Sequence, residues 1–245
     1  MGHSGSSDAR WFRLAYHAGR TTADEAMRMT VLRVALSGLW ALGVCYPDPR
    51  VLWQAILNAW RPPIDGSAVQ DWARTLPDDP AAIEQAVHQR VQYAVPWQTL
   101  GVPWAFPSPG QTVTAGRGDC QARAVVFASV LAAKGIPFQL RASLDHMWVE
   151  YRGKRPNVLE NAAKTLWTRP LPTLAPGFLN PHGAVSPVGL TDQAAAGSPA
   201  IRFRFPAVDW AESWRIEREY FWDAAPLSRK ALLALGLALI WTLRR

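Results

Sequence analysis

The sequence predicts an α+β fold in which one central helix packs on a small antiparallel sheet. A helix with clear start and stop signals covers residues 120–134, and segments of alternating hydrophobicity follow at 138–144 and 146–151. Apolar residues make up 49% of the 245 residues and charged residues 18%. That balance supports a buried core and argues against wholesale disorder.

The N-terminal part of the chain predicts helices. Residues 1–23 begin with small polar residues, and we expect this end to be disordered. A helix is predicted over residues 24–46, apolar in its second half and ended by Pro47. A shorter apolar helix is predicted over residues 51–60. Residues 24–75 therefore form an N-terminal helical segment that is a candidate for membrane association.

The predicted core domain covers residues 76–165. Its first helix, residues 81–93, is indicated by Asp79 as N-cap and by the proline that follows it. Residues 94–118 are rich in Pro, Gly and Trp, which predicts an ordered loop or groove wall instead of regular structure. A third strand is predicted over residues 157–161.

The C-terminal part predicts an extension and a last helix. Residues 166–228 are rich in Pro and Gly, and residues 210–222 within them read as an amphipathic helix. Residues 229–245 are apolar with basic residues at both ends, which makes them a second candidate for a membrane anchor.

The charge and the cysteines exclude several classes of function. The net charge is +7, but the basic residues are scattered and form no run that would follow a phosphate backbone, so no nucleic-acid partner is expected. Two cysteines, Cys45 and Cys120, cannot make a disulfide framework or a four-thiolate metal site. The remaining histidines are scattered and none pairs with His146 at short range, so we expect no metal and no cofactor.

Cys120 has the setting of a nucleophile. Asp119 is a good N-cap, and glycines before it let the chain turn sharply into the helix. The sulfur would then lie at a helix N-terminus, where unpaired N–H groups stabilise a thiolate. Cys45 ends an apolar stretch and has no such setting.

His146 is the matching general base. It begins the second alternating segment, where Trp148 and Glu150 share its face by the strand period of two. A third residue should orient the imidazole and should come from the next strand. Glu160 and Asn161 are the polar candidates there.

Residues 116–151, GRGDCQARAVVFASVLAAKGIPFQLRASLDHMWVEY, resemble the core of the transglutaminase-like superfamily. Three fragments carry the resemblance: Gly-Asp-Cys at a helix start, Gly-Ile-Pro at its end, and His-x-Trp-Val-Glu on a following strand. The resemblance implies a papain-like fold with a Cys-His-Asp triad, and it assigns Cys120 and His146. The family's Asp has no counterpart, and we favour Asn161, with Glu160 as the alternative.

The resemblance implies acyl transfer at an amide or peptide bond of a protein or peptide substrate. The oxyanion would need donors: the Cys120 backbone N–H and, just upstream, the Trp97 indole or the Gln98 amide. Hydrolysis is favoured over cross-linking, because no lysine-binding site is visible in the sequence. The alternatives are a binding or scaffolding module with an idle site, and a membrane-anchored maturation factor for a specific partner.

Two apolar runs, residues 34–46 and 231–243, are candidates for membrane-spanning helices. Each is shorter than the roughly 20 residues of a spanning helix, and flanking residues would extend both. The positive-inside rule then predicts cytoplasmic chain ends and an extracytoplasmic catalytic domain. A soluble cytoplasmic protein with two buried helices is one alternative. A signal peptide starting at Met27 or Met29 is another.

Overall fold

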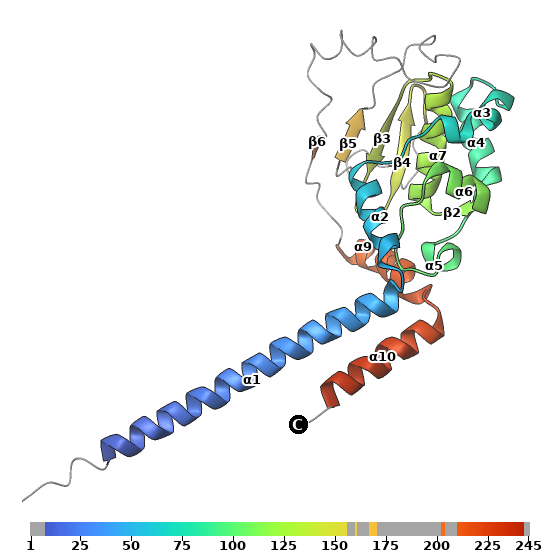
Figure 1. The fold of residues 1–245 in the computed structure, drawn as a ribbon. Coiled ribbons are helices and arrows are strands. Elements are labelled where there is room, and N and C mark those ends of the chain that lie inside the picture. Colours follow the sequence, from blue (N-terminus) through green and yellow to red (C-terminus); the bar gives the residue numbers. More distant parts are fainter. Residues whose placement is uncertain (1–7, 156–159, 161–166, 171–201, 204–209, 243–245) are drawn as a thin grey trace, which may run out of the picture. The chain divides into compact units, whose positions relative to one another are not determined.

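A computed structural model describes residues 8–155, 160, 167–170, 202–203 and 210–242 (Figure 1). The chain divides into two compact units. The first combines Met1–Pro47 with Pro226–Arg245, and the second is Asp48–Ala225. The predicted boundary at residue 75 is therefore wrong, because the second predicted helix belongs to the same unit as the central helix.

The first unit is a hairpin of two helices, α1 (Asp8–Cys45) and α10 (Leu227–Thr242). Their pairing is antiparallel, since the Trp40 indole donates to the Leu232 carbonyl (3.1 Å) and the Trp241 indole to the Ser37 hydroxyl (3.2 Å). Gly236 lets the helices approach, because a Cβ atom there would lie 2.1 Å from the Trp40 ring.

α1 begins earlier than the sequence predicts. Disorder over residues 1–23 is wrong from Asp8 onward, while residues 1–7 lie outside the described part. The stretch after Asp8 contains no proline and several Ala and Arg, which are strong helix formers. Within α1, Glu25–Cys45 is long and apolar enough to cross a membrane as one helix, and only 6% of its apolar part is buried.

The second unit is rich in helices. They are α2 (Pro49–Trp60), η1 (Ser67–Val69), α3 (Gln70–Thr75), α4 (Pro80–Arg90), α5 (Pro96–Thr99), α6 (Pro109–Ala115), α7 (Cys120–Ala133), α9 (Trp210–Glu217) and the π-helical turn η4 (Arg218–Asp223). The helices predicted near residues 51–60, 81–93, 120–134 and 210–222 are confirmed, although α4 ends at Arg90 and η4 continues α9 with wider turns.

The prediction of an irregular loop over residues 94–118 is wrong in part, since it contains α5 and α6. Both begin with a proline at the first helical position. α6 also has a capping box between Ser108 and Gln111, and Gly116 ends it with a left-handed φ of 63°. β1 (Gln92–Tyr93) and β2 (Arg117–Gly118) flank this stretch and pair in parallel.

The main sheet has four antiparallel strands in the order β4-β3-β5-β6. They are β3 (Phe138–Ala142), β4 (Met147–Tyr151), β5 (Trp167–Pro170) and β6 (Arg202–Phe203), with Leu140 opposite Val149 in the β3–β4 pair. The third strand predicted over residues 157–161 lies outside the described residues apart from Glu160, which is in no strand. Among the described residues, the strand that follows β3 and β4 in this sheet is β5, which pairs with β3.

α7 is the centre of the core. It is apolar on all its faces, which suits a helix surrounded by other elements. Its side chains pack with those of α4 and of the β3–β4 pair in one cluster that includes Val126, Leu131, Ile83 and Val149. Figure 1 shows α7 against the sheet with the smaller helices on its other side. The fold is therefore α+β, as predicted.

Candidate active site

Cys120 is the first residue of α7. The Asp119 side chain caps the helix by accepting the Ala122 N–H at 2.9 Å, as predicted. Gly118 is required by space, because a Cβ atom there would lie 2.6 Å from the Ala122 Cβ atom and 3.2 Å from Thr112. The sequence Gly-Asp-Cys thus fixes the sulfur at the helix N-terminus through a cap and a close packing contact.

His146 lies directly before β4, at the end of the sheet. A tight turn holds it: the His146 N–H donates to the Ser143 hydroxyl (3.1 Å), and the Ser143 N–H donates to the His146 carbonyl (2.8 Å). The imidazole stacks on the Trp148 ring, with centroids 6.0 Å apart and planes 14° apart. The predicted shared face of His146 and Trp148 is therefore present.

The nucleophile and the base candidates line the same two pockets, each of about 220 Å³. The aromatic pocket is lined by both of them together with Trp104, Phe106, Tyr220 and Phe221. The charged pocket is lined by both of them together with Glu84, Arg123, Lys154 and Glu160. A backbone hydrogen bond from Met147 to the Cys120 sulfur joins the start of β4 to the start of α7.

The electrostatics of Cys120 differ from the expectation of a stabilised thiolate. Burial, and then the charge of Asp119, raise the pKa of the thiol to about 12, and the Met147 hydrogen bond only partly offsets them. Burial also lowers the pKa of His146. Both groups are therefore neutral near pH 7.

Glu160 is the described candidate for the third residue. It is 7% exposed, and Lys154 donates to it at 2.8 Å. Among the charges that favour the protonated imidazole, Glu160 acts more strongly on the pKa of His146 than Asp145 does. Asn161, the favoured candidate from sequence, lies outside the described residues.

Lys154 holds this carboxylate as part of a buried ion cluster. Its ammonium group is 4% exposed and also contacts Glu84 (3.0 Å) and the Val149 carbonyl (2.8 Å). The Tyr151 hydroxyl donates to Glu84 at 2.8 Å. The cluster fixes the floor of the charged pocket.

The two predicted oxyanion side chains do not line either pocket. The Trp97 indole N–H donates to the Phe221 carbonyl at 2.8 Å, so it is engaged in packing, and Gln98 is exposed. Gln121 is better placed, because it lines the aromatic pocket beside Cys120 and its amide oxygen accepts the Trp104 indole N–H at 3.1 Å. That hydrogen bond orients the amide and leaves its NH₂ group as the donor.

Residues of α9 and η4 form one wall of the aromatic pocket. Ile216, Glu217, Tyr220 and Phe221 line it, and the Tyr220 hydroxyl donates to Asp119. In the sequence, the only signal for this role is the apolar face of residues 210–222, which does not indicate what that face covers.

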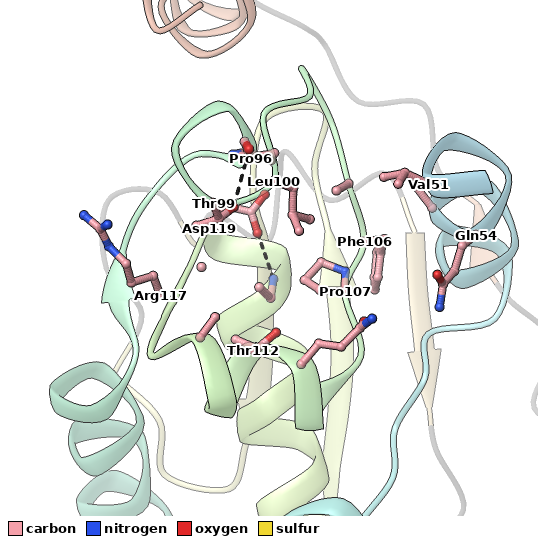
Figure 2. A pocket seen from close by; sticks show the side chains of 16 residues that line it. Val51, Gln54, Pro96, Thr99, Leu100, Phe106, Pro107, Thr112, Arg117 and Asp119 are labelled. Atoms are coloured by element: carbon pink, nitrogen blue, oxygen red, sulfur yellow. Dashed lines mark hydrogen bonds between the residues drawn. The ribbon is translucent and has the colours of Figure 1, made fainter. Parts of the chain in front are cut away.

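A third, largely apolar pocket of about 160 Å³ lies on the other side of Asp119 (Figure 2). Val51 of α2, Pro96 and Leu100 near α5, and Thr112 of α6 surround it. Phe106 separates it from the aromatic pocket, since it lines both. Neither Cys120 nor His146 lines it, so it is not where the proposed reaction would occur.

No group of three or more His, Cys, Asp or Glu placed to hold a metal ion occurs within the described part of the chain. The chain matches no protein-family model, no curated protein and no solved structure.

Proposed function

We propose that the chain is a cysteine-dependent acyl-transfer enzyme of the transglutaminase-like type, acting on an amide or peptide bond. Cys120 is the nucleophile and His146 its general base. One observation supports the proposal most directly: a cysteine at a helix N-terminus and a histidine at the adjoining end of the sheet line the same two pockets.

The reaction begins from a neutral pair. The Cys120 sulfur attacks the substrate carbonyl carbon while His146 takes its proton, because the raised thiol pKa leaves little thiolate at rest. The imidazolium then gives that proton to the leaving nitrogen as the C–N bond breaks. A thioester on Cys120 and a free amine result.

Water completes the cycle. His146 removes a proton from water as its oxygen attacks the thioester, and the acid leaves while the sulfur regains a proton. Gln121 and the Cys120 backbone N–H are the donors proposed for the oxyanion at both stages. Glu160 or Asn161 would orient the imidazole and stabilise its protonated form.

A specific observation favours a second candidate function. The thiol pKa of Cys120 is raised, which is the opposite of the stabilised thiolate found in many cysteine enzymes. A module that binds protein or peptide ligands in the aromatic pocket and performs no chemistry would have the same property. The two candidates differ in whether Cys120 accepts an acyl group.

Activity-based labelling separates them. A thiol-directed acyl probe is added to wild type and to the Cys120→Ala, His146→Ala and Cys45→Ala variants, and the labelled peptide is identified by mass spectrometry. If the protein is an enzyme, Cys120 is labelled in the wild type and in Cys45→Ala, and the label is lost in Cys120→Ala and His146→Ala. Absence of label on Cys120 in the wild type would favour the binding module, and so would label that persists in His146→Ala at the wild-type rate, because the thiol then reacts without help from the imidazole.

The hairpin of α1 and α10 supports a membrane-anchored form of this enzyme. Glu25–Cys45 matches the length of a spanning helix, and α10 at 16 residues spans roughly 24 Å. The Arg229 guanidinium donates to the Val44 carbonyl at 2.9 Å, so the end of α1 and the start of α10 meet. Both chain ends then lie on one side, the cytoplasmic one, and Asp48–Ala225 on the other.

A further inference from the structure

We propose that Tyr220 is a positioning residue that sets the reactivity of Cys120 through Asp119. The inference rests on the proposed function of Cys120, and three observations support it. They concern the Asp119 carboxylate, the anchoring of η4, and the wall of the aromatic pocket.

The Asp119 carboxylate is buried and has a specific partner on each oxygen. It is 2% exposed. One oxygen accepts the Ala122 N–H at 2.9 Å, and the other accepts the Tyr220 hydroxyl. A buried carboxylate oxygen that loses its donor carries an uncompensated desolvation cost, so the Tyr220 hydroxyl both holds this cap in place and offsets part of its negative charge.

The charge of Asp119 reaches the sulfur directly. The two residues are adjacent in sequence, and the carboxylate is the main charged group that raises the thiol pKa. The Tyr220 hydroxyl places the positive end of its O–H dipole on that carboxylate. Without it, the potential at the sulfur becomes more negative, and the thiolate becomes harder to form.

Contacts of η4 with its neighbours keep the Tyr220 hydroxyl close to Asp119. The Trp97 indole donates to the Phe221 carbonyl at 2.8 Å, and the rings of Tyr220 and Phe221 meet edge to face with centroids 5.0 Å apart. Ile216 and Glu217 continue the same wall of the aromatic pocket. One segment thus closes the pocket and contacts the cap of the nucleophile's helix.

Other ionisable groups line the two pockets that Cys120 lines. They are Asp145, His146 and Glu217 in the aromatic pocket, and Glu84, His88, Tyr93, Arg123, Lys154 and Glu160 in the charged pocket. A test must therefore isolate the path through Asp119 from these background charges. A double-mutant cycle does so, because the background is common to all four proteins.

The cycle uses Tyr220→Phe and Asp119→Asn, alone and together, in a Cys45→Ala background. Asn is an equally good N-cap but carries no charge. The rate of Cys120 alkylation by iodoacetamide is measured from pH 6 to pH 10, and Tyr46→Phe serves as the matched control. Thermal melting checks that each variant is folded.

Tyr220→Phe is expected to slow alkylation at fixed pH by about tenfold, which corresponds to about one unit in the thiol pKa. Asp119→Asn is expected to accelerate it. In the Asp119→Asn background the second substitution should have no effect. An unchanged rate in Tyr220→Phe, or the same slowing in both backgrounds, would overturn the inference.

A second measurement remains informative even if the Tyr220→Phe variant does not fold. Burial, and then the charge and hydrogen bond of Asp119, raise the pKa of the Tyr220 phenol far above its ordinary value. Asp119→Asn should therefore lower the pH at which Tyr220 ionises, followed by ultraviolet absorbance in a pH titration, and a titration curve identical to that of the wild type would refute the contact. Neither measurement requires turnover, so failure of acyl labelling at Cys120 would count against the function alone.

Discussion

At the scale of single residues, the site combines groups whose burial works against their charged forms. Cys120 and His146 are both kept neutral, while Asp119, Glu160 and Lys154 are buried with partners. A neutral thiol beside a neutral imidazole is protected from adventitious oxidation and alkylation, because the thiolate is the reactive form. The proposed acyl transfer then requires a substrate that places its carbonyl carbon at the sulfur while the proton moves to the imidazole.

The Lys154 cluster gives a prediction at this scale. Lys154→Met removes the cation between Glu84 and Glu160 and leaves two carboxylates facing each other with little water. Breaking a buried pair in this way costs about 3 kcal/mol in the free energy of unfolding, measured by urea denaturation. Arg74→Met is the control, because its pair with Asp71 is exposed and should cost less than about 1 kcal/mol. Equal effects in the two variants would contradict the buried cluster.

At the scale of elements, the sequence predicted those helices whose ends carry local signals. Asp79 before Pro80 and Asp119 before Cys120 both act as caps in the structure. The start and end of α7, and the β3–β4 hairpin with His146 beside it, follow from the same local patterns. Local chemistry is enough for these elements because each is stabilised by residues within a few positions.

The contacts that could not be predicted from the sequence join residues that lie far apart in the chain. Tyr220 contacts Asp119 across 101 positions, and Trp97 donates to Phe221 across 124. The sequence suggests Trp97 as an oxyanion donor because it precedes Cys120 in the chain, but a tertiary contact uses its N–H group. Gln121 follows Cys120 directly, but no sequence signal singles it out, because a polar residue in a helix has many possible roles.

Gly118 gives a prediction at the scale of the cap and helix. Gly118→Ala forces a methyl group to within 2.6 Å of Ala122, so the first turn of α7 must shift. We expect a loss of about 1–3 kcal/mol in the free energy of unfolding and a lower rate of acyl labelling at Cys120. In Gly110→Ala, the new Cβ atom meets only Ala68 at 3.7 Å, an ordinary contact, so neither quantity should fall. Similar losses in both variants would argue against the tight packing at Gly118.

At the scale of the whole molecule, the two units differ in how far they bury their apolar side chains. The second unit buries a compact core around α7. The hairpin exposes large apolar side chains on both helices, among them Leu39, Leu42, Leu235 and Leu239. Exposed apolar surface of this extent marks an interaction site, and a lipid bilayer fits a hairpin of two apolar helices.

The proposed orientation can be measured by cysteine accessibility. Asp71→Cys is introduced into a chain that lacks Cys45 and Cys120, since the Asp71 side chain is 99% exposed in the second unit. An impermeant maleimide should label it in intact cells, while an epitope tag after Arg245 becomes accessible only after permeabilisation. The chain should also resist extraction by carbonate. Release by carbonate, or labelling of Asp71→Cys only after lysis, would contradict the anchored, extracytoplasmic arrangement.

The central claim is that Cys120 and His146 act on one carbonyl carbon. The direct measurement is the intact mass of the protein after brief reaction with an activated acyl ester, followed by hydroxylamine. The account predicts one acyl group on Cys120, released by hydroxylamine as expected for a thioester, and formed at least about a hundredfold more slowly in His146→Ala. Acylation of Cys120 at equal rates with and without the imidazole, or none at Cys120 in the wild type, would contradict it.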